Sequence, residues 1–300
     1  MLANRQSLGL VLGVVGVAVF AGSLPASRIA VGEVSPYFLT AMRATLAGVG
    51  GIAMLAFTRR TWPPREAWWP LLVCALTLVL GFPLLSALAM VTVPSAQGGV
   101  ILGIMPLATT AAAALIEGER PSAGFWIAAV IGSALVMGFA LYRSGGYTLS
   151  AGDLFLLGAV ICGGIGYTYS GGLTRLMPGW EVISWAVVLS LPVSLAGVLL
   201  AWPDDVGGIS ARAWTAILYA GLMAQFLGFF LFNAAMGMAG ISRVGQIGLL
   251  QPFFVVLIAA LFAREPIDPL TVLFAAAVVA TVAIGTRLKV TRPRAMTLPR

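Results

Sequence analysis

The stretch AWWPLLVCALTLVLGFPLLSALAM at residues 67–90 returns in altered form as AWTAILYAGLMAQFLGFFLFNAAM at residues 213–236. The same shift of 146 positions (67 to 213), made without gaps, also places Pro106 on Pro252 and Glu119 on Glu265. Matches of Ala or Leu mean little in so apolar a chain, whereas Trp, Met, Pro and Glu matches in one register are informative. They indicate an internal duplication.

The amino-acid composition indicates that most of the chain lies in a lipid bilayer and not in water. Of its 300 residues 60% are hydrophobic and 9% are charged, with a mean hydropathy of +1.02, whereas soluble domains carry roughly 25% charged residues. The apolar stretches reach the roughly 20 residues that a helix needs to cross a bilayer. A backbone in lipid must bond to itself and no alternating barrel pattern is present, so we expect an all-α membrane protein.

The apolar stretches predict ten transmembrane helices in one domain of two halves. Residues 1–142 form the first five-helix repeat, 143–151 a polar linker, 152–286 the second repeat and 287–300 a basic cytoplasmic tail. The predicted spans are 8–30, 36–58, 68–90, 95–116, 122–141, 152–174, 180–201, 213–238, 242–262 and 267–286.

Five is an odd number of spans, so the second repeat enters the membrane from the side opposite to the first. The sequence thus predicts inverted repeats, the recurrent architecture of secondary transporters. With the N-terminus inside, inner segments hold twelve of the 17 Lys and Arg residues and outer segments hold four. The positive-inside rule then places both termini in the cytoplasm of a bacterial-type inner membrane.

Absences limit the function. The chain has no His and two Cys, both in apolar stretches, so no metal site, cofactor or histidine catalysis is expected. The net charge of +7 is concentrated at span ends and in the tail, which indicates a membrane surface and not nucleic acid. No acidic residue is expected at the bilayer centre, which disfavours proton-coupled export of cationic drugs. The expected partners are a small-molecule substrate and the lipid bilayer, with the chain as monomer or homodimer.

Two prolines predict broken helices. Pro106 and Pro252 lie near the middle of the fourth and ninth spans, where each removes the hydrogen bond to the carbonyl of Leu102 or Gly248. Breaks in corresponding positions of two halves point to a binding site between repeats. The alternative is a packing kink that never contacts substrate. Similar breaks are expected at Gly81-Phe82-Pro83, at Gly22 with Pro25, and at Gly163, Gly164 and Gly166.

One copy has become polar where the other has not. Four amides of the second half replace apolar residues at equivalent positions of the first half. Gln225 and Phe229 are four apart, so one helical stripe presents an amide and an aromatic face. The alternative is hydrogen bonding between helices, which contributes about 0.6 kcal/mol per bond. The four amides are Gln225, Asn233, Gln246 and Gln251.

Arg43 is costly inside a span unless it snorkels or pairs. We expect it to lie near the outer end of its helix with Glu33 as a partner, in a structural role. Of Tyr167 and Tyr169, two residues apart, at most one should face a cavity. The sequence therefore predicts an uncharged chamber, with candidate substrate-binding residues Phe82, Pro106, Tyr167, Gln225, Phe229, Asn233, Gln246, Gln251 and Pro252.

The chain resembles the ten-helix, EamA-type branch of the drug/metabolite transporter superfamily. Ser35-Pro36 followed by Leu39, Ala41 and Arg43 is similar to that family's SP-x-x-L-x-A-x-R pattern. Pro106 followed by Gly118-Glu119-Arg120 resembles its P…GER signature, with Gln251-Pro252 and Glu265 as the diverged second copy. Trp126 and Gly138 fit the residues that follow GER, but Ala263 and Arg264 precede Glu265 where the family has Gly.

Membership would imply export of small metabolites through a central cavity. The expected function is a secondary transporter exporting small neutral or zwitterionic metabolites, most similar to the amino-acid exporters, including those for aromatic amino acids. It would work by alternating access and would not be an enzyme. A multidrug efflux carrier of the same fold is the alternative, followed by a non-transporting membrane subunit and by an intramembrane enzyme, for which no general base is present.

Overall fold

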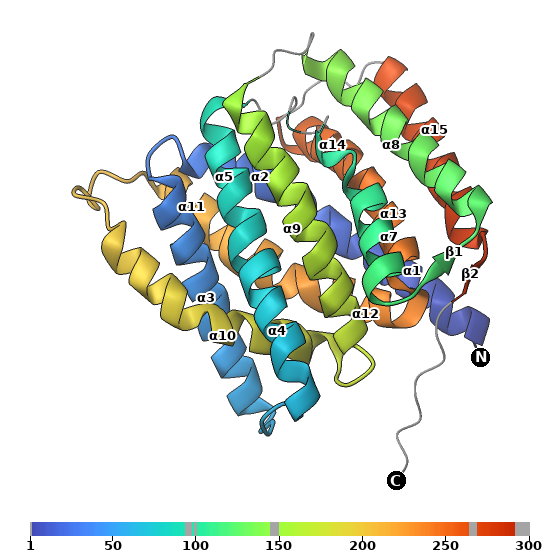
Figure 1. Cartoon of the computed structure of the whole chain (residues 1–300). Helices are drawn as coiled ribbons and strands as arrows, with labels where there is room; N and C mark the ends of the chain where they lie inside the picture. The colour runs from blue at the N-terminus through green and yellow to red at the C-terminus, as the bar shows by residue number, and fades with distance from the viewer. Residues whose placement is uncertain (1, 94–97, 99–100, 145–149, 264–268, 292–300) are drawn as a thin grey trace.

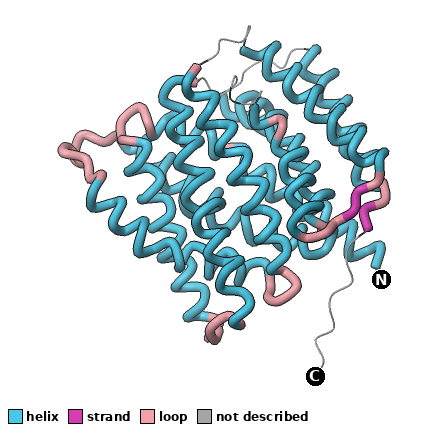
Figure 2. The backbone as a smooth tube through the Cα atoms, viewed as in Figure 1, coloured by secondary structure: helices cyan, strands magenta, loops and turns pink. Residues whose placement is uncertain are grey.

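The computed structural model describes residues 2–93, 98, 101–144, 150–263 and 269–291. This part of the chain is nearly all helical, and its helices pack side by side in one bundle (Figures 1 and 2). The α-helices are α1 (Leu2–Ala21), α2 (Ser23–Ala30), α3 (Pro36–Phe57), α4 (Trp68–Cys74), α5 (Phe82–Thr92), α7 (Met105–Ile116), α8 (Ala123–Ser144), α9 (Ala151–Leu173), α10 (Gly179–Leu200), α11 (Ala211–Leu218), α12 (Gly228–Ala239), α13 (Ile241–Ile247), α14 (Gln251–Ala263) and α15 (Pro269–Arg287).

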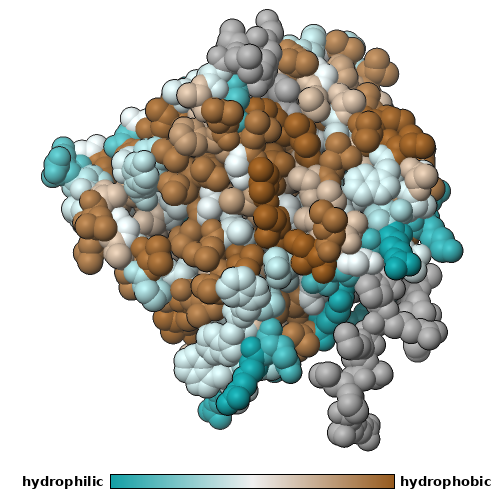
Figure 3. Space-filling model, viewed as in Figure 1, coloured by the Kyte–Doolittle hydropathy of each residue, from teal (hydrophilic) through white to brown (hydrophobic). Residues whose placement is uncertain are grey.

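Within the described residues, eight helical segments are long and apolar enough to cross a membrane, and Met105–Ile116 and Ile241–Leu257 are shorter apolar helices. Large apolar side chains are exposed around the bundle, among them Leu115 at 86% and Leu200 at 89%. Figure 3 shows apolar residues over the middle of one face and hydrophilic residues along its lower edge. Exposed apolar surface of this extent is typical of a protein whose solvent is lipid.

Local sequence explains where several helices begin. Ser35 accepts a hydrogen bond from the Phe38 amide at 3.1 Å and Pro36 opens α3, an N-cap followed by proline. At the start of α9 the Ser150 amide donates to Asp153 Oδ2 at 2.7 Å, which is one half of a capping box. The helix before it, α8, continues to Ser144, and α9 begins at Ala151, so both ends of the predicted linker 143–151 are helical; residues 145–149 lie outside the described part.

Helices at equivalent positions of the two copies pack against each other. α3 lies along α10 (Figure 1), with Gly51 facing Val187 and Gly197 facing Ala41. Under the shift of 146, Ala41 is equivalent to Val187 and Gly51 is equivalent to Gly197. The contact of Gly51 with Val187 and the contact of Gly197 with Ala41 are therefore equivalent contacts in which the two copies exchange roles. Low numbers of α3 meet high numbers of α10, so these equivalent helices run antiparallel.

The same relation holds at the other side of the bundle. α8 packs along α15, where Gly138 faces Phe274 and Gly124 faces Leu288, again in antiparallel order. Two short strands, β1 (Arg120–Pro121) and β2 (Val290–Thr291), extend this contact as an antiparallel pair. The contacts of the two copies are thus exchanged by an approximate twofold axis, as in a self-complementary dimer interface.

Four long segments are interrupted, and they correspond in pairs. The helix spanning 65–92 contains a π-helical stretch, η2 (Ala75–Gly81), after a 3-10 turn η1 (Arg65–Ala67), and the helix spanning 211–239 contains η3 (Tyr219–Leu227). The segment predicted as the fourth span turns at residues 103–104 before α7. The segment predicted as the ninth span narrows to the 3-10 turn η4 (Gly248–Leu250) between α13 and α14. π-Helical stretches in α-helices are frequent at functional sites.

The predicted break at Gly22 is present between α1 and α2, and the break at Gly81–Pro83 takes the form of the π-helix η2. The break expected at Gly163, Gly164 and Gly166 is wrong, because α9 is continuous there. These glycines instead admit neighbours: Gly163 faces Met105 and Gly164 faces the backbone of Ala108 in α7. Their role is close helix packing.

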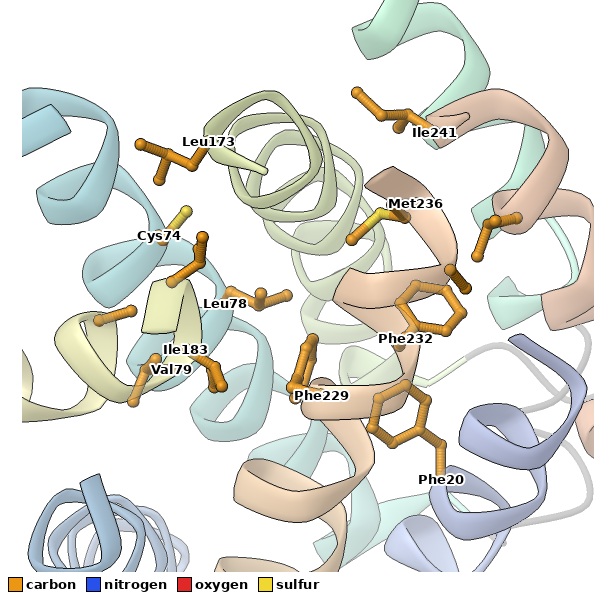
Figure 4. Close-up of a cluster of buried hydrophobic side chains, with 14 of the residues drawn as sticks. Phe20, Cys74, Leu78, Val79, Leu173, Ile183, Phe229, Phe232, Met236 and Ile241 are labelled. Atoms are coloured by element: carbon orange, nitrogen blue, oxygen red, sulfur yellow. The ribbon is translucent and has the colours of Figure 1, made fainter. Parts of the chain in front are cut away.

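The main apolar core joins the two copies. Figure 4 shows Cys74, Leu78 and Val79 of the first copy opposite Phe229, Phe232 and Met236 of α12, with Phe20 approaching the two phenylalanines from α1.

Candidate functional site

A cavity lies where the interrupted helices of both copies meet. About 840 Å³ of atom-free space is associated with it, the part open to its surroundings included. A pocket with mostly apolar walls and a few polar groups is what small-molecule sites show. It is lined by Val17, Phe20, Ser23, Leu24, Arg43, Leu78, Phe82, Pro83, Leu102, Met105, Thr109, Tyr167, Ala224, Gln225, Phe229, Phe232, Gly245, Gly248 and Gln251.

The wall is built from corresponding positions of the two copies. Four pairs of lining residues are related by the shift of 146, and each pair contributes one residue from either copy. The cavity therefore lies near the axis that exchanges the copies. The pairs are Leu78 with Ala224, Pro83 with Phe229, Leu102 with Gly248, and Met105 with Gln251.

Four rings form one apolar wall. Phe20 lies 4.8 Å from Phe229 and 5.3 Å from Phe232, measured between ring centroids. Tyr167 lies 5.1 Å from Phe232 and 6.0 Å from Phe229. Aromatic clusters of this kind present large, rigid apolar surfaces. The wall suits a solute with an apolar or aromatic body.

Two of the predicted amides reach the cavity. Gln225 donates from Nε2 to the carbonyl oxygen of Val79 at 2.7 Å, a bond between residues 146 positions apart. Gln225 thus bonds the backbone of its own counterpart, and its Oε1 has no partner among the described residues. Gln251 donates from Nε2 to the carbonyl oxygen of Phe20 at 3.3 Å, next to the break that precedes α2.

Arg43 differs from its expected position. It is only 5% exposed and lines the cavity. Its Nη2 donates to Ser23 Oγ at 3.5 Å, and its Nε has no partner in the described structure. The expected partner Glu33 instead accepts from the Ser210 amide and hydroxyl, both at 2.7 Å. The prediction of an uncharged chamber is therefore wrong.

Five predicted residues line the cavity together: Phe82, Tyr167, Gln225, Phe229 and Gln251. The other four lie outside its lining. Pro106 is buried in the first turn of α7, and Pro252 is half-buried in the first turn of α14. The two prolines open the helices that bring Met105 and Gln251 to the wall.

Asn233 and Gln246 face helix contacts. Asn233 accepts from Ser170 Oγ at 2.9 Å and donates to the Gly179 carbonyl oxygen at 3.1 Å. Gln246 donates to the Phe125 carbonyl oxygen at 3.4 Å and abuts Gly285.

Sequence reasoning missed three polar residues of the wall, namely Arg43 as a cavity residue, Ser23 and Thr109. Thr109 follows Pro106 by three positions, which puts it one helical turn beyond the break. Its hydroxyl is buried and has no partner among the described residues. A search for polar residues one turn from each predicted break would have found it.

One end of the bundle is closed by carboxylates. Glu119 accepts from the Ile241 amide at 3.2 Å, the Ser242 amide at 3.0 Å and the Ser242 hydroxyl at 2.5 Å, which joins the end of α7 to the start of α13. Glu117 pairs with Arg175 at 2.8 Å. Burial raises the pKa of Glu117 above its ordinary value, although Arg175 opposes the shift.

Among the described residues no group of three or more His, Cys, Asp or Glu side chains could hold a metal ion. The lining offers hydrogen-bond donors and acceptors, one cation and an aromatic wall. These groups can bind and orient a solute.

Comparison with known proteins agrees with this architecture. The model of the EamA-like transporter family matches residues 7–141 and, a second time, residues 150–286. A bundle of apolar helices around a central cavity, matched twice by one transporter model, defines a membrane transporter made of two repeats. The chain belongs to the EamA-like transporter family, within the drug/metabolite transporter superfamily.

Its similarity to a curated relative and to a solved structure covers 95% of the chain. It is 40% identical over 284 residues to a protein of Bacillus subtilis (strain 168) described as "Uncharacterized transporter YdeK", covering 95% of this chain and 99% of the relative. A solved crystal structure that is 19% identical superimposes with a TM-score of 0.75, covering 95% of this chain and 96% of the other. At that identity the superposition shows a shared fold.

Proposed function

We propose that this protein exports small neutral or zwitterionic metabolites, amino acids first, by alternating access of two inverted five-helix repeats. The observation that carries the proposal is the cavity wall, to which corresponding positions of the two copies contribute in pairs. If the copies exchange conformations, one shared site opens to each side in turn.

The packing of equivalent helices supports the proposed inversion of the repeats. α3 and α10 are the second span of their respective copies, and they run antiparallel. Two equivalent spans that cross one bilayer in opposite directions belong to repeats of opposite orientation. We therefore propose that the protein has ten membrane spans, of which α7 and the α13–α14 pair are shorter and interrupted.

The termini are proposed to lie in the cytoplasm of a bacterial-type inner membrane. The N-terminal end of α1 lies on the same side of the bundle as β2 (Figure 1). Exposed arginines at the ends of spans on this side include Arg59, Arg60 and Arg120. The positive-inside rule assigns this side to the cytoplasm.

Amino acids suit the wall better than cationic drugs do. No residue of the lining is acidic, so the wall offers a cationic drug no counter-charge. The aromatic rings and the free acceptor of Gln225 suit a solute with an apolar body and a hydrogen-bonding end. Aromatic amino acids combine these features.

The test is a counterflow assay in proteoliposomes with the twenty amino acids, with and without a pH gradient. Gln225→Ala and Gln251→Leu should each lower flux about 10-fold at unchanged yield, since the loss of a hydrogen bond to a charged group of the solute costs about 1.5–3 kcal/mol. Gln246→Leu, an amide outside the lining, is the matched control and should retain flux. Unchanged flux in both cavity variants would remove these amides from the site, and absence of flux for every solute would refute the carrier. Flux of cationic dyes in place of amino acids would establish the multidrug alternative.

A further inference from the structure

Arg43 is the one charged side chain on the described cavity wall. It is 5% exposed, and the ion pairs found in the described residues join Arg60 to Glu181 and Arg175 to Glu117, neither of which involves it. Its contact with Ser23 is long, and its Nε is unpartnered. A buried guanidinium is thus held beside empty space without a counter-charge.

A buried charge without compensation is expensive, and proteins tolerate it where a partner arrives during function. Snorkelling to the membrane surface does not relieve Arg43, because the side chain is enclosed by protein. Glu33, the nearest acidic residue in the sequence, is engaged by Ser210. The compensating anion must therefore enter the cavity.

We propose that Arg43 binds a carboxylate of the transported solute, so that the substrates are small monocarboxylates with an apolar or aromatic body. This inference rests on the proposed transport function and narrows its substrate class. A planar guanidinium matches a carboxylate with two parallel hydrogen bonds. Ser23, already beside the guanidinium, adds a hydroxyl donor at the same end of the cavity.

The rest of the cavity wall fits a solute that carries a single negative charge. A phosphate ester would carry about two charges, and the described lining has a single cation and no Lys. The rings of Phe20, Phe229 and Phe232 supply an apolar surface for the body of the solute. The unpartnered acceptors of Gln225 and Thr109 can accommodate an ammonium group without requiring one.

The test uses four probes that share a phenyl body: phenylalanine, 3-phenylpropionate, phenylalaninamide and phenethylamine. In proteoliposomes the wild-type protein should prefer phenylalanine and 3-phenylpropionate, which carry a carboxylate, over phenylalaninamide and phenethylamine, which carry none, by about 10-fold or more. Arg43→Gln should abolish that preference, and Arg43→Lys should keep part of it, because a point charge replaces the bidentate fork. Arg212→Gln, an exposed arginine away from the cavity, is the matched control and should behave as wild type.

The preference is a ratio within each variant, so it does not depend on how much protein folds. If Arg43→Gln gives no folded protein, Arg43→Lys and Ser23→Ala decide, and each should reduce the preference at least about 3-fold. An unchanged preference in these variants, or equal wild-type flux of all four probes, overturns the carboxylate assignment while the carrier stands. Absence of wild-type flux for every probe and every amino acid overturns the proposed function itself.

Discussion

Replacing Glu119 with Ala should destabilise the end of the bundle where α7 meets α13. The carboxylate is 2% exposed and receives two backbone amides and one hydroxyl, from Ile241 and Ser242. A buried donor left unpaired costs about 1–3 kcal/mol. The two amides cannot turn elsewhere, whereas the hydroxyl can rotate, so the free energy of unfolding should fall by about 2–6 kcal/mol. Loss of a negative charge at the start of α13 adds about 0.3–1 kcal/mol.

The measurement is equilibrium unfolding of the purified protein in mixed micelles with increasing SDS, followed by tryptophan fluorescence. Ser242→Ala is the matched control, since it removes the hydroxyl and leaves both amides bonded to Glu119; it should cost about 1–2 kcal/mol. If Glu119→Ala costs no more than Ser242→Ala, the carboxylate is not what holds α7 to α13, and the reasoning fails.

Three further outcomes are expected. Asn233→Ala should lower the free energy of unfolding by about 1–2 kcal/mol by removing the hydrogen bonds to Ser170 and to the Gly179 carbonyl, while flux per folded molecule stays unchanged. A flux defect without lost stability would place this amide in the site. Gly51→Ala should cost about 1–3 kcal/mol in SDS unfolding, because the new Cβ would lie 2.9 Å from the carbonyl oxygen of Ser184; a neutral result would mean that α3 and α10 can separate. Hydrogen bonds from the Ser210 hydroxyl and amide lower the pKa of Glu33 below 4.5, so these bonds stabilise the folded protein above pH 4.5, and the stabilisation is lost as the pH falls below that value. Glu33→Gln should abolish this acid dependence of the free energy of unfolding, measured between pH 3 and 6. An unaltered dependence would assign it to another group.

The sequence sufficed for the duplication, for the nearly all-helical fold and for the helix interruptions before Pro106 and Pro252. All three depend on patterns that a membrane makes strong: runs of about 20 apolar residues, and matched prolines in corresponding spans. The interruptions before Pro106 and Pro252 lie where the missing proline amides put them. The antiparallel contact of equivalent helices agrees with the odd number of spans predicted for each copy.

The rotation of each helix about its axis could not be predicted. Gln225 and Asn233 lie eight positions apart in one apolar segment, yet one reaches the cavity and the other bonds α9 and α10. In a soluble protein the polar face of a helix points to water, but here lipid and core are both apolar, so hydropathy does not distinguish them. The predicted position of Arg43 at the membrane surface is wrong for a related reason. Its distance from the end of the helix is compatible with the membrane surface, and the sequence does not show that its side chain turns toward the interior of the protein.

The bond between Gln225 and the Val79 carbonyl also bears on how the two halves diverged. A residue at a symmetry axis faces its own duplicate, so a large side chain there leaves no room for a second one. After the duplication, a long side chain at Gln225 left space only for a short side chain at the equivalent position, Val79. Val79 therefore contributes only its backbone carbonyl to the contact. Unequal chemistry at the centre is thus a geometric consequence of building a carrier from two related parts.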